Sequence, residues 1–315
     1  MAEDRLTLGI VGLGKMGGNF ALQALEKGIS VVGKEKSEKP ELRRRGVKIA
    51  GTYEEFVSFL EPPRVIYLSL PAGPIIDTVV GELVPHLSAG DVLMDGGNSF
   101  YLDSIRREKQ LSENNLLFLD CGTSGGLTGA RHGACFMVGG KAEGIALAEP
   151  ILKKLAVKDG FLHTGPPGSG HYVKLVHNGI EFGMLQAIGE GATLLAKCDF
   201  RLNLEKVFKN WSNGSVIRCW LVELMQKGLE EQSLEQIESH VEDTGEVNWL
   251  VQIAMKKEIP IPVITQSVIE LFKSRDVSSL TYQAIALMRH GFGGHPFGKD
   301  GRITKERETS RIQKI

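Results

Sequence analysis

Short apolar segments alternate with amphipathic ones in the first half of the chain. The apolar run Leu6–Val11 is followed by the helix-like segment Asn19–Lys27 and then by a second apolar run, Ile29–Val32. Runs of the same kind recur at residues 47–50, 65–70, 92–95, 116–121 and 135–138. Alternation of strands and helices is typical of a mostly parallel sheet covered on both faces. We therefore expect residues 1–165 to form a doubly wound α/β domain.

The pattern becomes helical after residue 165. The segment 165–170, Gly-Pro-Pro-Gly-Ser-Gly, cannot continue regular structure and is predicted to be a linker. Apolar residues then recur with a helical period in four long segments, at residues 171–197, 204–227, 236–257 and 263–289. We expect an all-α second domain over residues 166–298 and a polar tail over residues 299–315.

Composition narrows the class of protein. With 315 residues the chain is long enough for two domains, and its net charge of -1 favours neither nucleic acid nor a membrane surface. No apolar run is long enough to cross a bilayer, and the first residues do not read as a secretory signal. The 4 cysteines lack the spacing of a zinc site, so we expect free thiols, a cytoplasmic protein and no metal.

A glycine-rich turn follows the first apolar run. It reads Gly12-Leu13-Gly14-Lys15-Met16-Gly17, a Gly-x-Gly-x-x-Gly pattern between a strand and a helix. In this pattern the first glycine permits a tight turn, the second lets the backbone approach a diphosphate, and the third allows close helix packing. The diphosphate lies at the helix N-terminus, where free N–H groups favour an anion. Residues 12–17 therefore predict a Rossmann-type dinucleotide-binding domain.

The end of the second apolar run bears on which dinucleotide binds. Glu35 lies 18 residues past Gly17, where an acidic side chain accepts hydrogen bonds from a ribose 2′-hydroxyl and rejects a 2′-phosphate. The flanking Lys34 and Lys36, and the arginines at 43–45, either form a solvated face or receive the phosphate of NADP. We favour NAD and include Glu35 and Lys36 among the cofactor-binding residues.

Three polar loops follow later strands, at the sheet edge where ligands collect in this architecture. Leu70 and Pro71 end one strand and are expected to contact the cofactor. Asn98, in the sequence Asp-Gly-Gly-Asn-Ser, is expected to touch the nicotinamide end of the cofactor or the substrate, although a plain turn uses similar residues. The glycine-rich segment 122–140, which includes Ser124, Gly125 and Gly126, exposes backbone N–H groups and a hydroxyl, which suits a carboxylate or polyol ligand, although glycine's tolerance of unusual φ/ψ explains part of this composition.

One helix-like segment carries four polar residues on a single face. Lys174, His177, Asn178 and Glu181 are spaced i, i+3, i+4 and i+7, whereas the rest of residues 173–185 is apolar or small. Burying a charged side chain without partners is costly, so this stripe is not expected to serve solubility. We interpret Lys174 and Glu181 as a proton donor and acceptor pair on an otherwise buried helix.

Arg289 and His295 lie six residues apart near the C-terminal end. The planar guanidinium of arginine is the preferred phosphate ligand, because it can donate two parallel N–H bonds. Arg289 and His295 are therefore candidate phosphate ligands. A cation at a helix C-terminus next to a glycine cap explains the same residues equally well. The residues alone leave both interpretations open.

These segments together resemble the 6-phosphogluconate dehydrogenase family, in its shorter form with a reduced helical domain. The resemblance rests on residues 12–17, 95–99, 124–126, 170–181 and 289–295, which span nearly the whole chain. The related β-hydroxyacid dehydrogenases share the glycine fingerprint, the Ser-Gly-Gly loop and a Lys followed four residues later by Asn. They generally lack the His-Asn pair followed by Glu, so the stripe on residues 174–181 discriminates between the two groups.

The resemblance implies oxidative decarboxylation of 6-phosphogluconate to ribulose 5-phosphate and CO2, with NAD or NADP as hydride acceptor. Lys174 would be the base and then the acid at the C3 oxygen, and Glu181 would protonate the enediol carbon. The substrate would be bound by Asn98, Ser124, Gly125, Gly126, His177, Asn178, Arg289 and His295. The last two would reach the active site of a neighbouring subunit, which implies a homodimer or a dimer-based higher oligomer.

Two other functions stay open at this point. One is a β-hydroxyacid dehydrogenase that does not decarboxylate. Its substrate carries no phosphate, so it would not need Arg289 and His295 as phosphate ligands. A dinucleotide sensor without turnover has no need of the acid and base residues on the stripe. Phe182 and Glu246 depart from the long-form pattern, so the sequence does not fix how the phosphate is bound.

Overall fold

The computed structural model describes residues 6–276, 279–293 and 297–298. The strands of its α/β part are β1 Thr7–Val11, β2 Ser30–Lys34, β3 Lys48–Ala50, β4 Val65–Leu68, β5 Val92–Asp95, β6 Leu117–Ser124, β7 Ala134–Gly140 and β8 Ala156–Gly165. The helices between them are α1 Lys15–Glu26, α2 Pro40–Arg44, α3 Tyr53–Ser58, α4 Pro74–Leu83, η1 Val84–His86, α5 Tyr101–Ser112, α6 Gly126–His132 and α7 Ala142–Leu155.

The strands form one sheet in the order β3-β2-β1-β4-β5-β6-β7-β8. Neighbouring strands pair parallel, except that β6 and β7 pair antiparallel. The strand order reverses at β1: β2 and β3 lie on one side of it, and β4 and the later strands lie on the other. Ligands bind at such a topological switch point. The predicted Rossmann-type, doubly wound fold is confirmed.

Strand β8 was not expected from the apolar pattern. It lies at the sheet edge, paired with β7, and its sequence carries Lys158 and Asp159 in place of an apolar run. Edge strands commonly carry charged residues, because charge discourages pairing with other chains. The hydrophobic signal that finds central strands is therefore weak at this edge.

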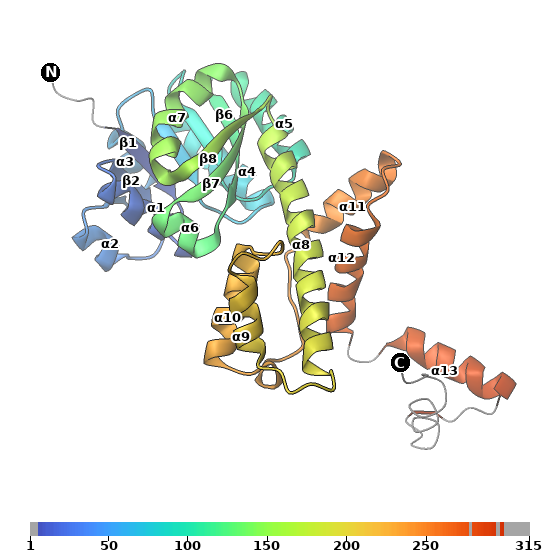
Figure 1. Cartoon of the computed structure of the whole chain (residues 1–315). Helices are drawn as coiled ribbons and strands as arrows, with labels where there is room; N and C mark the ends of the chain where they lie inside the picture. The colour runs from blue at the N-terminus through green and yellow to red at the C-terminus, as the bar shows by residue number, and fades with distance from the viewer. Residues whose placement is uncertain (1–5, 277–278, 294–296, 299–315) are drawn as a thin grey trace. The chain divides into compact units, whose positions relative to one another are not determined.

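Helices cover both faces of the sheet, as Figure 1 shows. One buried cluster joins the strands to α1, α6 and α7, and the other joins them to α3, α4 and α5. Successive residues of a strand serve opposite faces: Val31 belongs to the first cluster and Val32 to the second. Burial on both faces explains why the central strands read as continuous apolar runs.

The elements after β8 are helical, as predicted. They are α8 Ser169–Ala196, α9 Leu204–Trp211, α10 Trp220–Glu231, η2 Leu234–Gln236, α11 Glu246–Lys256, α12 Pro262–Arg275 and α13 Leu280–Gly293. The long helix predicted at residues 171–197 corresponds to α8. Among the described residues, none of the helices has the length and apolar content that crossing a bilayer demands.

The other three predicted long helices are wrong in length. The segment 204–227 is divided into α9 and α10, with Gly214 between them at a positive φ of 75°. The segment 236–257 becomes α-helical only after Gly245, whose φ is 84°. The segment 263–289 is divided into α12 and α13. Glycine at positive φ leaves the right-handed helical region and here interrupts the helices, after the end of α9 and directly before α11. The periodic apolar pattern alone does not reveal such a break.

The structure separates into two compact units. One comprises the described residues up to Ala187 together with Gly245–Ile264, and the other comprises Ile188–Thr244 and the described residues from Thr265 onward. The first unit holds the sheet, the N-terminal part of α8 and α11. In the second unit, Ala192, Phe208 and Val222 form the centre of a small helical core. The boundary predicted at residue 165 stays a prediction.

Candidate active site

The glycine fingerprint forms a tight turn between β1 and α1. Gly12 has φ 91°, and its N–H donates to the carbonyl of Lys34 at 2.9 Å. A Cβ on Gly12 would collide with the Ser69 carbonyl, and one on Gly17 would collide with the Gly12 carbonyl. A Cβ on Gly14, by contrast, would meet no protein atom within 4 Å. Protein packing does not account for Gly14, whereas close approach of a diphosphate does, so the turn fits a dinucleotide.

Glu35 follows β2 and is bound to the fingerprint turn. Its Oε2 accepts the Leu13 N–H at 2.9 Å, and its Oε1 accepts the Lys36 N–H at 2.8 Å. Burial raises the pKa of Glu35, but the N–H groups of Lys36, Leu13 and Ser37 together outweigh burial and bring the pKa below its usual value. Glu35 is therefore an ionised carboxylate beside the predicted ribose site.

Two loops at the carboxyl edge of the sheet lie near this turn. The Ser69 N–H donates to the carbonyl of Val11 at 2.8 Å, so the loop that carries Leu70 and Pro71 starts beside the fingerprint. The loop after β5 holds Asn98 in a left-handed conformation, with φ 56°. The Asn98 amide donates to Glu246 Oε1 at 3.2 Å and accepts from Asn178 Nδ2 at 3.5 Å.

The start of α8 is fixed against β6. The Asp120 carboxylate accepts the N–H groups of Gly168 at 2.7 Å and His171 at 2.8 Å, which satisfies donors at the helix N-terminus. Gly122 lets the helix approach the strand, because a Cβ there would lie 2.6 Å from Lys174 Cβ. The packing of α8 against β6 therefore fixes the position of the Lys174 backbone.

The polar stripe of α8 forms a connected chain of contacts. Lys174 Nζ lies 3.4 Å from His177 Nδ1, and His177 Nε2 lies 3.1 Å from Ser124 Oγ. His177 Nδ1 is also 3.2 Å from Asn178 Oδ1 and 3.8 Å from Glu181 Oε2. Side chains from α8 and the end of β6 therefore converge on His177. After β6 ends at Ser124, Gly125 and Gly126 have φ 112° and 56°, and α6 begins at Gly126.

The environment of the stripe lowers the pKa values of Lys174 and His177. Lys174 is 7% exposed, and burial lowers its pKa from the ordinary value, against the raising effect of Glu181, Cys135 and Glu246. Burial and the positive charge of Lys174 lower the pKa of His177 as well. A lysine with a lowered pKa can accept a proton, which an ordinary surface lysine does poorly at neutral pH.

The side chains of two predicted phosphate ligands are not described, and two residues that the sequence analysis did not assign to the site contribute to it. Arg289 lies in α13 but its side chain is outside the described part of the chain, and so is His295. Glu246 was noted in the sequence only as a departure, yet it contacts Asn98 in this site. Asp120 was not singled out at all; its helix-capping role depends on a contact across 51 residues that no local pattern reveals.

The expectation that α8 is buried around its polar stripe is wrong for the single chain. Val173, Ile180, Met184 and Leu185 are 38%, 53%, 39% and 46% exposed. These side chains form the apolar surface of the same helix that carries Lys174. Among the described residues, no group of three or more His, Cys, Asp or Glu side chains is placed to hold a metal ion.

The fold and the fingerprint define a dinucleotide-binding oxidoreductase. Residues 7–165 match the family model described as the NAD binding domain of 6-phosphogluconate dehydrogenase, and residues 170–310 match that of its C-terminal domain. The chain belongs to the 6-phosphogluconate dehydrogenase family.

Individual relatives agree with this assignment. The chain is 41% identical to YqeC of Bacillus subtilis, named only provisionally as a 6-phosphogluconate dehydrogenase, over 92% of this chain and 98% of the relative. It is 39% identical to the NAD(+)-dependent, decarboxylating 6-phosphogluconate dehydrogenase of Haloferax volcanii, with the same coverage of both chains.

Solved structures show the same fold. The 6-phosphogluconate dehydrogenase of Plasmodium falciparum superposes with a TM-score of 0.80 at 28% identity, over 94% of this chain and 66% of that one. The 3-hydroxyisobutyrate dehydrogenase of Salmonella typhimurium has a TM-score of 0.72 at 19% identity, over 87% and 95%, and shares the fold alone.

Proposed function

We propose that this protein catalyses the NAD-dependent oxidative decarboxylation of 6-phospho-D-gluconate to D-ribulose 5-phosphate and CO2. The observation that carries the proposal is the buried Lys174 amine, with its lowered pKa, in contact with His177 on a helix that also presents Glu181. The first-listed relatives that carry a 6-phosphogluconate dehydrogenase name are matched over nearly their full length.

The dinucleotide would be held by residues 12–17, Glu35, Lys36, Leu70, Pro71 and Asn98. When bound, it supplies the acceptor for the hydride from C3 of the substrate. Lys174, as a neutral amine, takes the proton of the C3 hydroxyl, and the product of this step is a β-keto acid. His177 lies 3.4 Å from the Lys174 amine, so it is placed to orient that amine and the sugar hydroxyls.

Loss of CO2 requires that the electrons of the broken C1–C2 bond move toward the ketone. Lys174, now an ammonium, returns its proton to the C3 oxygen as CO2 leaves, which gives an enediol. Glu181 then supplies the proton that the former carboxyl-bearing carbon needs. In this scheme Ser124, Gly125 and Gly126 hold the carboxylate end, and Asn98 and Asn178 hold hydroxyl groups.

Glu35 supports NAD as the preferred dinucleotide. Its ionised carboxylate can accept hydrogen bonds from a ribose 2′-hydroxyl, and it repels a 2′-phosphate. The Haloferax volcanii relative is named as NAD(+)-dependent. Replacing Glu35 by Asn should therefore reduce the ratio of kcat/KM for NAD to that for NADP.

A homodimer and a cytoplasmic location are part of the same proposal. The exposed apolar residues on α8, such as Ile180 at 53%, favour a second subunit as their cover. In the proposed dimer, Arg289 and His295 of one subunit bind the substrate phosphate in the active site of the other.

The decisive experiment measures CO2 release and cofactor reduction together, with 6-phosphogluconate and with either NAD or NADP. Equal amounts of CO2 and reduced cofactor, with NAD preferred, are expected. Cofactor reduction without CO2 would favour a β-hydroxyacid dehydrogenase that stops at the ketone or aldehyde. Cofactor binding without turnover of any hydroxy acid would favour a sensor.

A further inference from the structure

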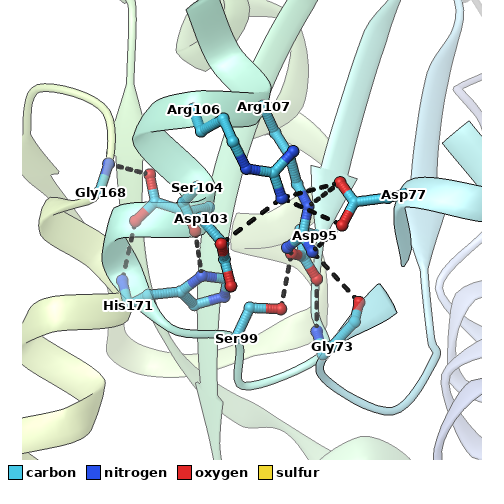
Figure 2. A network of polar contacts seen from close by, with 12 residues as sticks. Gly73, Asp77, Asp95, Ser99, Asp103, Ser104, Arg106, Arg107, Gly168 and His171 are labelled. Atoms are coloured by element: carbon cyan, nitrogen blue, oxygen red, sulfur yellow. Dashed lines mark hydrogen bonds and ion pairs between the residues drawn. The ribbon is translucent and has the colours of Figure 1, made fainter. Parts of the chain in front are cut away.

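A buried arginine lies between the two loops that the proposed function places around the nicotinamide. Arg107 on α5 is 2% exposed, and Figure 2 shows its guanidinium between Asp77 and Asp95. Its Nε and Nη2 donate to the two oxygens of Asp77 at 2.9 and 3.0 Å. Its Nη1 donates to Asp95 Oδ2 at 3.1 Å, and its Nη2 also donates to the Gly73 carbonyl at 3.2 Å.

Two of the groups that Arg107 binds, the Gly73 carbonyl and the Asp77 carboxylate, directly follow the loop after β4. Gly73 is the N-cap of α4, two residues past Pro71, and Asp77 lies in the first turn of that helix. Hydrogen bonds and positive charge from Arg107 and, to a smaller extent, from Arg106 bring the pKa of Asp77 to about 2, so this carboxylate stays ionised and paired at neutral pH. The guanidinium therefore fixes the end of the loop that carries Leu70 and Pro71.

The third group that Arg107 binds, the Asp95 carboxylate, lies at the start of the loop after β5. Asp95 is fully buried; its Oδ1 accepts the Gly97 N–H at 2.9 Å and its Oδ2 accepts the Ser99 hydroxyl at 2.8 Å. These two bonds enclose Asn98, the residue held at φ 56° with its amide toward Asn178 and Glu246. The carboxylate that Arg107 binds is thus the one that shapes the Asn98 turn.

We propose that Arg107 is a positioning residue that couples the cofactor loop at 70–73 to the substrate loop at 95–99. It acts through Asp95 and Asp77 and touches neither ligand; the proposal rests on the function proposed above. A guanidinium is planar and carries five donors, so it can bind both carboxylates and a carbonyl at once. A lysine at this position keeps the charge but cannot span both loops.

The neighbouring residue provides a matched control. Arg106 also donates to both oxygens of Asp77, each at 3.0 Å, and its side chain is 42% exposed. Its other contacts go to Asp103 and Gln110 on its own helix. Arg106→Lys therefore weakens a second arginine contact to Asp77 and keeps the local charge, but leaves the bonds of Arg107 to Asp77, Gly73 and Asp95 in place.

The test compares Arg107→Lys with Arg106→Lys in the full-length protein, after thermal unfolding has shown that each variant is folded. The affinity for NADH is measured by fluorescence without substrate, and hydrogen exchange at residues 95–99 is measured with and without NADH. In the wild type, NADH should slow exchange at residues 95–99. In Arg107→Lys this protection should be lost, NADH should bind about tenfold more weakly, and kcat should fall about tenfold or more. Arg106→Lys should stay within about twofold of the wild type throughout.

Unchanged NADH affinity and unchanged protection in a folded Arg107→Lys would overturn the proposal, as would equal effects in Arg106→Lys. If Arg107→Lys does not fold, Asp77→Asn weakens the same connection at its partly exposed end and should also reduce the protection of residues 95–99 by NADH. Retained protection in that variant would likewise overturn it. The NADH measurements need no sugar acid, so failure of the wild type to oxidise 6-phosphogluconate would contradict the proposed function while leaving this test intact.

Discussion

Lys174 illustrates how function and stability oppose each other at one residue. Burial lowers its pKa, which means that the folded protein disfavours the charged ammonium. We expect Lys174→Met to abolish cofactor reduction and to raise the free energy of unfolding by about 1 kcal/mol, because methionine fills the site without a buried charge. Steady-state rates and urea unfolding measure the two effects. The exposed Lys109→Met should change neither, and retained turnover in Lys174→Met would remove this lysine as the base.

Glu246 should influence the pH dependence through Lys174. Burial lowers the pKa of Lys174, while electrostatic interactions with Glu181, Cys135 and Glu246 raise it. Removing one negative charge in Glu246→Gln should therefore lower the pKa of Lys174 further. The rising limb of kcat/KM against pH, where Lys174 loses its proton, should then move to lower pH.

The control for this pH profile is Glu113→Gln, which neutralises an exposed carboxylate at the end of α5. Its profile should coincide with that of the wild type. A limb that moves to higher pH in Glu246→Gln, or that stays in place, would show that Glu246 does not act on Lys174.

At the scale of elements, the close approach of α8 to β6 depends on Gly122. A Cβ at this position would lie 2.6 Å from Lys174 Cβ and 2.9 Å from the Gly170 carbonyl, so the helix must shift. We expect Gly122→Ala to cost about 1–3 kcal/mol in unfolding free energy and to reduce kcat, because Lys174 moves with its helix. Gly81→Ala in α4 serves as the control, since its Cβ would meet nothing within 4 Å. Equal stability and activity of the two variants would contradict this account of the packing.

The elements that sequence could predict are those whose signal is local. The strands β1, β2 and β4 to β7 read as apolar runs because both faces of the sheet are covered there, and the stripe on α8 follows from helical spacing. The polar edge strand β8 and the breaks at Gly214 and Gly245 lack such a signal. Contacts between segments that are distant in sequence could not be predicted either. Arg107 reads as one more charge on an amphipathic helix, and its burial against Asp95 appears only in the folded chain.

At the scale of the whole molecule, α8 combines the proposed catalytic stripe with an apolar surface that the single chain leaves exposed. Ile180 is 53% exposed and lies next to Glu181 in sequence. A second subunit that covers this surface would stand beside the active site, where the proposed phosphate ligands Arg289 and His295 are needed. The proposed dimer is therefore tied to catalysis, and this can be tested without knowing its geometry.

Mixing two inactive variants tests whether Arg289 acts across subunits. If it does, a dimer of one Lys174→Met chain and one Arg289→Met chain has one doubly defective site and one intact site. Random reassembly of equal amounts should then restore about one quarter of the wild-type kcat, since half of the dimers are mixed. A mixture of Lys174→Met with Asn178→Ala should stay inactive, because both residues belong to the same subunit's stripe and each mixed site carries one defect. If the Arg289→Met mixture also stays inactive, although mixed dimers are detected by mass spectrometry, Arg289 serves its own subunit. If Arg289→Met alone keeps its activity, Arg289 serves no active site.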